Sequence, residues 1–372
     1  MATGPSRSRK RVRNLGILTG GGDCPGLNAV IRAAVLTAEQ ADVRVMGIRN
    51  AYSGLIHKQL TLLDADNVED LLQRGGTVLG SSNRDNPFSF LMTIDGEQKQ
   101  VDLSDTVLEN FREAGLDGLI AIGGDGTIQI TYALTKKGLP AICVPKTIDN
   151  DLMATDVTFG FDTAVGTATD AIDKIRTTAE SHGRAMVIEV MGRNAGWIAL
   201  FSGLAGGASI ILIPEIPFTM DSIVASVREN RASGRNFSII VVAEGAHEAE
   251  KDVVVRALVD DPTEPRRLGG IGNLVGEAVE RETGIETRVT VLGHIQRGGT
   301  PSTYDRNLST RFGVHAALNA IEGRFGQMVA LRNGRIVLAP LAEAAQGQRL
   351  VPPDGDFIRV ARAVGISFGD EV

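Results

Sequence analysis

The chain has 372 residues, which is too many for one ordinary hydrophobic core and enough for two domains. Hydrophobic residues make up 43% and charged residues 22%, which is ordinary for a soluble globular protein. The net charge of −7 excludes nucleic-acid binding by bulk electrostatics, so an anionic partner must be attracted by local arginines.

The sequence also limits where the chain works. The two cysteines, Cys24 and Cys143, are too few for a disulfide framework or a zinc site, so we expect a cytoplasmic protein. No run of about 18 apolar residues occurs, so we expect no membrane partner. Residues 1–13 are basic with no apolar segment behind them, which predicts a disordered tail and excludes a signal peptide; a phosphate-binding or targeting arm is the alternative.

Short apolar runs then alternate with helical patterns along the first half of the chain. This alternation predicts parallel strands with helices on both faces of the sheet. The expected strands are NLGILTG, VRVMGI, GLIAIGG and AICVP, and the expected helices are Leu27–Ala41, Ile128–Lys137 and Thr163–Ala179.

The same alternation resumes in the second half. It predicts strands at MVIEVMG, SIILIPE, SIIVVAEG and RVTVLGH, a helix at Asp305–Ile321, and short strands at QMVALRNG and RIVLAPL. His247–Gly272 is charged and proline-containing, so an irregular surface excursion is expected there. We therefore predict an α/β chain of two doubly wound domains with mainly parallel sheets. The predicted segments are 1–13, 14–160, 161–325 and a return segment at 326–372 that packs on the first domain.

Three loops that follow strand-like runs carry glycines and acidic side chains. Gly20–Asp23 lies at a strand-to-helix turn, where backbone N–H groups can approach a phosphate; an ordinary tight turn is the alternative. It matches neither GxGxxG nor the P-loop pattern. The GGDGT run at Gly123–Thr127 places a carboxylate at a helix start, which suits a magnesium–phosphate group but also occurs in lipid and NAD kinases.

The third loop, PKTIDND at Pro145–Asp151, carries two aspartates that are two residues apart. In an extended segment Asp149 and Asp151 point the same way, so one can meet an acceptor hydroxyl while the other orients a metal or the backbone. An Asx-rich turn is the alternative.

More charged side chains follow later strands, where open α/β sheets bind ligands. Arg193 lies in MGRNAGW, where a guanidinium can bind a phosphate, and Glu244 ends a strand where it can accept from a sugar hydroxyl. His294 and Arg297 lie in the glycine-bounded run GHIQRGG. Turn chemistry alone does not explain so many charged strand ends.

Together these motifs resemble the 6-phosphofructokinase family. TGGGDCPGLN, GGDGT, PKTIDND, MGRNAGW, PEIPF, VAEG and LGHIQRGGTPSTYDR occur in that family's order and spacing, over about Asn14 to Ala345. The resemblance implies transfer of the γ-phosphoryl group of ATP to the 1-hydroxyl of fructose 6-phosphate, a step of glycolysis, with Mg²⁺ as cofactor. It assigns nucleotide binding to 14–160 and sugar-phosphate binding to 161–325.

The resemblance also implies roles for single residues. In the nucleotide half, Gly22 and Arg84 would border the phosphates and Asp125 would bind the metal. On the acceptor side of the reaction, Thr147 and Asp149 would hold the acceptor, with Asp149 as general base and with Thr147 and Arg193 also catalytic. The remaining residues that the resemblance implies are Gly124, Gly126 and Thr127 for the nucleotide, and Met191, Gly192, Glu244, His294 and Arg297 for the sugar phosphate.

In the family, two further arginines reach the substrate from a neighbouring subunit. They match Arg184 and Arg288, which implies shared active sites and a homo-oligomer, either a tetramer or a dimer. The family's effector site is only partly matched: Arg32 and Arg176 are present, but Leu36 and Gln59 stand where arginines are expected. The resemblance therefore does not extend to control by ADP or phosphoenolpyruvate.

The phosphoryl donor depends on two positions. Pyrophosphate-using members usually carry Asp where this chain has Gly126, and Lys where it has Lys146, while the common bacterial ATP enzymes have Gly at both. This mixture resembles the actinobacterial branch. Because Gly126 leaves room for the α-phosphate of a nucleotide, we expect ATP to be the donor.

Other functions stay open at this point. Pyrophosphate is the alternative donor, and sedoheptulose 7-phosphate or another ketose phosphate is the alternative acceptor. A lipid or NAD kinase would share only GGDGT, and a non-catalytic sugar-phosphate binder would not need both Asp125 and Asp149.

Overall fold

The computed structural model describes residues 11–94, 96–258 and 266–371, so most of the expected basic tail lies outside the described residues. The chain forms two compact units, and each unit is assembled from three stretches of sequence. The first unit comprises Met1–Lys146, Leu152–Asp156 and Thr303–Gly347. The second unit comprises Thr147–Asp151, Val157–Ser302 and Gln348–Val372.

A seven-stranded sheet forms the centre of the first unit. In spatial order its strands are β15 (Arg335–Pro340), β14 (Gln327–Arg332), β7 (Ala141–Pro145), β6 (Gly118–Gly123), β1 (Asn14–Thr19), β2 (Arg44–Ile48) and β3 (Leu60–Leu63). The five inner strands pair in parallel, while the edge strands β15 and β3 pair antiparallel with their neighbours. The carboxyl ends of the five parallel strands therefore lie along one edge of the sheet.

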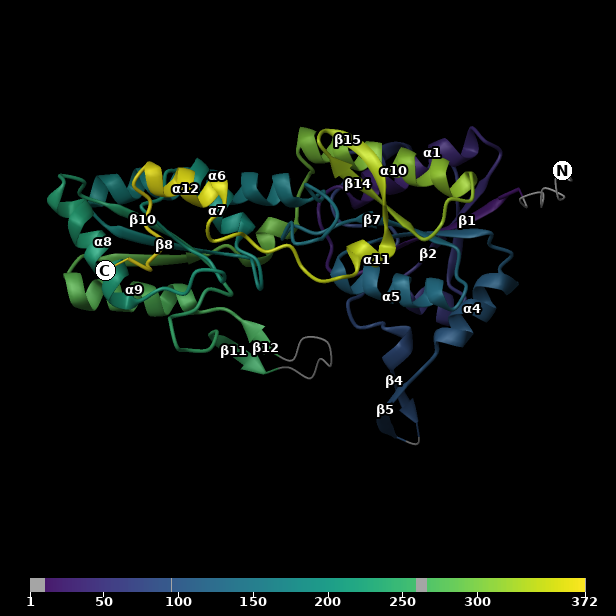
Figure 1. The fold of residues 1–372 in the computed structure, drawn as a ribbon, viewed down its shortest axis with the longest axis horizontal. Coiled ribbons are helices and arrows are strands. Elements are labelled where there is room, and N and C mark those ends of the chain that lie inside the picture. The colour runs from purple at the N-terminus through teal and green to yellow at the C-terminus, as the bar shows by residue number, and fades with distance from the viewer. Residues whose placement is uncertain (1–10, 95, 259–265, 372) are drawn as a thin grey trace, which may run out of the picture. The chain divides into compact units, whose positions relative to one another are not determined.

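Helices cover both faces of this sheet, as the strand–helix alternation predicts (Figure 1). One face carries α1 (Leu27–Glu39) and α10 (Thr303–Ile321), which pack against each other, and the other carries α5 (Asp125–Lys136) and α4 (Ser104–Glu113). The remaining helical segments of this unit are α2 (Ser53–Ile56), α3 (Ala65–Val68), η1 (Glu69–Leu71), η2 (Pro87–Ser89) and α11 (Leu341–Ala344).

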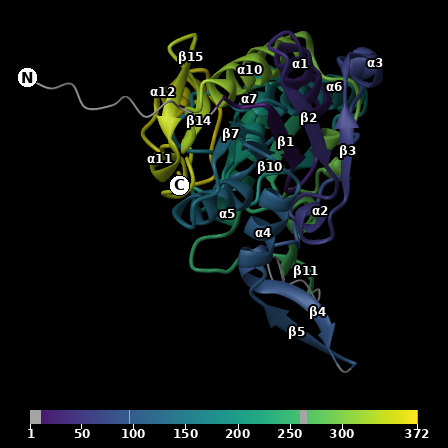
Figure 2. The same cartoon turned by 90° about the vertical axis from the view of Figure 1, so that its right-hand side faces the viewer.

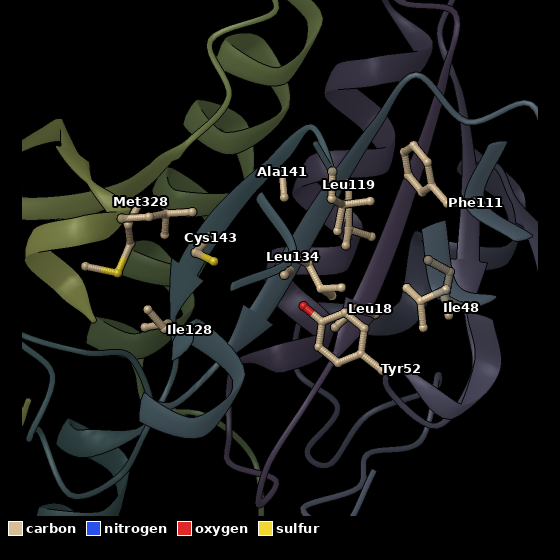
Figure 3. Close-up of a cluster of buried hydrophobic side chains, with 14 of the residues drawn as sticks. Leu18, Ile48, Tyr52, Phe111, Leu119, Ile128, Leu134, Ala141, Cys143 and Met328 are labelled. Atoms are coloured by element: carbon tan, nitrogen blue, oxygen red, sulfur yellow. The ribbon is translucent and has the colours of Figure 1, made fainter. Parts of the chain in front are cut away.

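A continuous apolar core fills the space between this sheet and α5 (Figure 3). Leu18 and Leu119 come from the inner strands, and Ile128 and Leu134 come from α5. Their side chains are fully buried because the inner strands are apolar on both faces. Burial fixes the carboxyl ends of β1, β6 and β7, and with them the loops that carry the predicted site residues.

The second unit has a four-stranded sheet in which all strands are parallel. In spatial order they are β13 (Thr287–Val291), β8 (Ala185–Val190), β10 (Ser238–Ala243) and β9 (Ile210–Leu212). In Figure 1, α6 (Phe161–His182), α7 (Trp197–Ala205) and α12 (Asp356–Ala363) lie on one face, with α8 (Met220–Ala232) and α9 (Ile271–Thr283) on the other. A second apolar core fills the α8/α9 side.

Two antiparallel strand pairs lie outside these sheets. β4 (Phe90–Ile94) pairs with β5 (Glu97–Val101) and extends away from α4 in Figure 2. β11 (Val255–Leu258) pairs with β12 (Arg266–Leu268), so the expectation that all of His247–Gly272 is irregular is wrong for these strands. The strands are short and charged, so they lack the apolar alternation that sequence reasoning uses to detect a strand.

The expected strands and long helices are confirmed, with shifts of a few residues at helix ends. Helix α6, for example, runs from Phe161 to His182 against an expected Thr163–Ala179, and it stops at Gly183 in a left-handed conformation. Within the described ranges, no helix is long and apolar enough to cross a membrane.

Candidate active site

The glycine turn after β1 packs directly against the start of α5 in the first unit. Gly20 N–H donates to the Ile122 carbonyl at 2.9 Å, which ties the turn to β6. A Cβ at Gly20 would lie 2.5 Å from the Thr127 hydroxyl oxygen, and one at Gly123 would also overlap the Thr127 side chain. Both glycines are therefore needed for this close approach, and the predicted residue Thr127 fills the space between them.

A neighbouring loop joins the glycine turn and carries Arg84. Gly21 N–H donates to the Ser82 carbonyl at 2.9 Å, and the Thr19 hydroxyl donates to the Gly80 carbonyl at 2.7 Å. Arg84 follows two residues later, with an exposed side chain, and its own N–H donates to the Ser82 hydroxyl at 3.2 Å. The structure thus places Arg84 and Gly22 on adjoining loops of one unit.

Lys146 brings a positive charge to the same turn. Its side chain is only 3% exposed, and its ammonium donates to the Gly22 carbonyl. Its backbone N–H donates to the Gly123 carbonyl at 3.0 Å, which fixes the residue at the end of β6. A buried ammonium beside a glycine turn is a favourable arrangement for an anionic ligand.

Asp125 is the first residue of α5, with Gly124 before it and Gly126 after it. Burial raises the pKa of Asp125, and a 2.8 Å hydrogen bond from the Gln129 side chain opposes that rise. Gly126 is exposed, and a Cβ built there would meet nothing within 4 Å. The space beside residue 126 is thus open.

The donor set of the first unit fits a magnesium ion that is carried mainly by phosphates. The described residues contain no group of three or more His, Cys, Asp or Glu side chains arranged to hold a metal. Mg²⁺ usually keeps several waters and takes one or two protein carboxylates together with substrate phosphates. The single half-buried carboxylate of Asp125 meets that requirement.

In the second unit, charged side chains gather where the parallel strands end. Glu244 follows β10, and burial raises the pKa of its carboxyl to about 7. The negative charges of Asp149 and Glu189 contribute to this rise in pKa, and the guanidinium groups of Arg193 and Arg297 oppose it. The structure thus brings three predicted site residues, Asp149, Arg193 and Arg297, near a fourth, Glu244, because each of the three influences its charge.

The loops that carry these residues approach each other closely. Glu244 N–H donates to the Val190 carbonyl at 2.9 Å, and Gly245 N–H donates to the Gly192 carbonyl at 3.0 Å. A Cβ at Gly245 would overlap the carbonyl oxygen of Arg193, so only glycine allows this contact. The backbone between Met191 and Arg193 is therefore held against the loop of Glu244.

The predicted acceptor loop belongs to the second unit. The Thr147 hydroxyl accepts from Asp149 N–H at 3.1 Å, and the Thr158 hydroxyl donates to the Thr147 carbonyl at 2.7 Å. Thr158 N–H also donates to the Asn150 side chain at 3.0 Å. Both Thr147 and Asp149 are half-buried, so they are fixed by the loop and still reach the surface.

The turn that carries His294 and Arg297 is the 3₁₀ helix η3 (Gly293–Arg297) after β13. Gln296 is fully buried in it, donates to the Gly293 carbonyl at 3.0 Å and accepts from Met191 N–H at 3.4 Å. The side chain of His294 is exposed and that of Arg297 is half-buried. Gln296 thus ties this turn to the loop of Met191.

Arg184 and Arg288 lie at the opposite edge of the same sheet. Arg184 directly precedes β8, and Arg288 is the second residue of β13, so both are at amino ends of strands. Glu286 forms ion pairs with both, and its distance to Arg184 is 2.9 Å. These two arginines are the predicted site residues that the second unit does not bring to the carboxyl edge.

Sequence reasoning missed several residues around these loops. Glu189 is 2% exposed, and its carboxylate accepts from the N–H groups of Gly270 and Gly272, at the start of α9. A charged residue inside the apolar strand AMVIEV was a signal for it. Gln296 and Glu215 lie inside recognised motifs, whereas Gln348 and Arg349 gave no local signal because their contacts span long sequence separations.

Comparison with known proteins agrees with this geometry. A sequence profile described as Phosphofructokinase matches residues 14–320. The ATP-dependent 6-phosphofructokinase of Chloroflexus aggregans is 51% identical over 97% of this chain and 99% of its own length. The pyrophosphate–fructose 6-phosphate 1-phosphotransferase of Amycolatopsis methanolica is 51% identical over 91% of this chain and 96% of its own length.

A solved structure supports the same relationship. The T-state phosphofructokinase of Pichia pastoris superimposes with a TM-score of 0.77 at 30% identity. The match covers 92% of this chain, and this chain spans 36% of that longer chain.

The doubly wound units and their charged strand ends define an α/β phosphate-binding protein. Because the family profile and full-length relatives cover nearly the whole sequence, the chain belongs to the phosphofructokinase family. The suspected resemblance to this family is thus confirmed.

The raised pKa of Glu244 predicts a pH-dependent stability difference. The pKa of an ordinary Glu is near 4.5, whereas that of Glu244 in the folded chain is about 7, so folding favours its neutral form. The stability that this protonation contributes in wild type is lost as pH rises through about 7. The Glu244→Gln variant has no carboxyl to titrate, so it does not lose stability in this way. In the ligand-free protein, the free energy of unfolding of the variant relative to wild type should therefore rise by about 1–3 kcal/mol between pH 5 and 8.

Urea unfolding of both proteins across this pH range measures the difference. Glu229→Gln, at an exposed position on α8, is the control and should show no such trend. A constant difference for Glu244→Gln across the range would contradict the raised pKa.

Proposed function

We propose that this chain transfers the γ-phosphoryl group of ATP to the 1-hydroxyl of fructose 6-phosphate, which yields fructose 1,6-bisphosphate and ADP. The observation that carries the proposal is the near full-length similarity, at about half of all positions, to relatives named for this reaction. The conserved chemistry of phosphoryl transfer is positioning and charge neutralisation, and both units offer groups for it.

The first unit is the proposed nucleotide half. The glycine turn, Arg84 and the buried ammonium of Lys146 would bind the phosphates of the donor. Asp125 would bind Mg²⁺, which neutralises charge on the transferred phosphoryl group when it is bound. Gly124, Gly126 and Thr127 would form the backbone surface next to the nucleotide at the start of α5.

The second unit is the proposed acceptor half. Asp149 would take the proton of the 1-hydroxyl as it attacks, and Thr147 would orient that hydroxyl. Arg193 would stabilise negative charge on the transferred group. Met191, Gly192 and Glu244 would contact the sugar, and His294 and Arg297 would bind its 6-phosphate.

Pyrophosphate is a second candidate donor, because the Amycolatopsis methanolica relative that uses it is as similar as the ATP-named relatives. The open space beside Gly126 favours ATP, since a nucleotide needs room for its α-phosphate and pyrophosphate does not. Lys146 neutralises phosphate charge with either donor.

The direct test is an assay of the purified protein with Mg²⁺ and fructose 6-phosphate, in which ATP and pyrophosphate are compared side by side. Sedoheptulose 7-phosphate in place of fructose 6-phosphate tests the acceptor. We expect ATP turnover with fructose 6-phosphate.

Asp149→Asn tests the assigned base and should lower kcat by about 10²–10⁴-fold, because the general base is lost. Asp221→Asn, at an exposed position on α8, is the matched control. Wild-type kcat in Asp149→Asn would refute the assigned base.

Gly126→Asp tests the donor argument separately. The variant should fold normally, because a Cβ at this position meets no neighbouring atom. Its carboxylate would crowd and repel the α-phosphate, so kcat/KM for ATP should fall by about 10²-fold or more. Gly126→Ala adds a Cβ without charge and should lose much less. Retained ATP kinetics in Gly126→Asp would count against the role of this open space.

We further propose that Arg184 and Arg288 act in the site of a neighbouring copy. They lie at the amino edge of a sheet whose carboxyl edge carries Glu244 and Arg193. β8 has six residues, which separates its ends by roughly 17–20 Å. This is beyond the reach of an arginine side chain, so within one chain these arginines cannot join the acceptor cluster.

Mixed oligomers test this shared site. Arg184→Ala and Asp149→Asn should each lose activity alone, but subunits unfolded and reassembled together should regain turnover, since one of the two sites receives both native residues. A mixture of Asp149→Asn with Glu244→Gln is the control and should regain none, because both changes affect the same edge. Failure of the first mixture to recover, with hybrids verified by native mass spectrometry, would exclude the shared site.

A further inference from the structure

The segment Gln348–Val351 connects two loops of the second unit that carry proposed reaction residues. One is the loop of Asp149, at Thr147–Asp151, and the other follows β8 and carries Arg193. The segment is about 150 to 200 residues away from both loops in sequence. We call it the strap, and each of its contacts below lies within the second unit.

Arg349 holds the two peptide groups that follow Asn150 and Asp151, through the carbonyl oxygens of these two residues. Its Nη2 and Nε atoms donate to the Asn150 carbonyl at 3.0 and 3.2 Å, and its backbone N–H donates to the Asp151 carbonyl at 2.7 Å. Two donors of one planar guanidinium on a single carbonyl fix its position more firmly than one donor would.

The backbone that Arg349 holds turns in a left-handed conformation. Asn150 has φ of 53°, in the left-handed region that non-glycine residues rarely adopt. Thr158 N–H donates to the Asn150 side chain from the other side, so the turn is fastened at both its carbonyl and its amide side chain. Because Asp149 precedes this turn, the turn sets the direction of the Asp149 side chain.

The guanidinium itself is held in place by Trp197. Its carbon lies 4.8 Å from the centre of the indole ring, in cation–π contact, and the indole N–H donates to the Arg349 carbonyl at 2.9 Å. Trp197 is 8% exposed and begins α7, four residues after Arg193. The strap is thus anchored on the element that follows the Arg193 loop.

The other strap residues connect the same two loops. The Gln348 side chain donates to Asp151 Oδ2 and accepts from the Asn194 side chain, both at 3.0 Å. Glu215 accepts from Val351 N–H at 2.8 Å and from Gly196 N–H at 3.0 Å. The loops of Asp149 and Arg193 are therefore linked through the strap, by the side chain of Gln348 directly and by that of Glu215 through Val351.

We propose that Arg349 is a positioning residue for phosphoryl transfer, which orients Asp149 by holding the left-handed turn at Asn150. The proposal rests on the proposed function, because it assigns the reacting proton to Asp149. A role limited to stability would attach the C-terminal segment anywhere on the unit, whereas this guanidinium donates to the carbonyl of the residue that follows the proposed base.

Arg349→Gln tests the proposal, with Arg359→Gln as the matched control. Arg359 lies in the same C-terminal segment, on α12, and its side chain bonds to exposed groups at Asp354 and Asp356. We expect kcat of Arg349→Gln to fall by about 10- to 100-fold, with KM for both substrates changed by less than about threefold, because misplacing a reacting group affects the chemical step. Arg349→Lys keeps the charge and one donating nitrogen in place of two, so it should recover part of kcat.

A double-mutant cycle with Asp149→Asn separates positioning from stability. If Arg349 acts through Asp149, Arg349→Gln should have almost no further effect on kcat in the Asp149→Asn background. An equal fold loss in both backgrounds, or wild-type kcat in Arg349→Gln alone, would overturn the proposal while leaving the proposed function intact. Wild-type kcat in Asp149→Asn alone would overturn the assigned base and, with it, this proposal, whereas absence of turnover in the wild-type protein would overturn the proposed function.

The single tryptophan of the chain provides a readout that is independent of activity. This tryptophan is Trp197, so the fluorescence of the protein reports on the indole ring that contacts Arg349. The emission maximum and intensity should change in Arg349→Gln and stay the same in Arg359→Gln, while thermal unfolding confirms that both variants are folded. An unchanged spectrum in folded Arg349→Gln would overturn the proposal.

Discussion

The meeting of parallel strand ends at one edge is the constraint on which the candidate site depends. In the second unit all four strands run the same way, so the residues that follow β8, β10 and β13 come close together whatever their sequence separation. Here those residues include the charged side chains of Arg193, Glu244 and Arg297, and Asp149 and Glu189 lie near them. The carboxylates of Asp149, Glu189 and Glu244 are near one another, and the protein compensates with Arg193 and Arg297.

This concentration of like charge is unfavourable for the fold and useful for chemistry. Glu189 satisfies its charge on backbone N–H groups at the start of α9, so it can remain buried. Among the described residues, burial dominates the environment of the Glu244 carboxyl, and it raises the pKa of Glu244 to about 7. Groups whose protonation is shifted by burial and by neighbouring charges gather at sites of reaction more often than elsewhere.

The sequence predicted the local features of the fold and failed on the long-range ones. Strands β1, β6, β8 and β10 are continuous apolar runs, and the glycine turns beside them are local signals, so both were predictable. Arg349 was not, because its partner at Asn150 lies about 200 residues away and no local pattern marks Arg349. Glu189 was visible only as one charge within an apolar strand, and its partners at the start of α9 were not.

The division of the chain has a consequence for biosynthesis. The first sheet requires β14 and β15, and the second unit requires the segment from Gln348 to the end of the described residues. Domains of most multidomain chains fold one after another as they leave the ribosome. Here neither unit can be completed before its last stretch, at Thr303–Gly347 or after Gln348, has emerged, so apolar surface of both stays exposed until then, and protection by chaperones becomes most valuable in that interval.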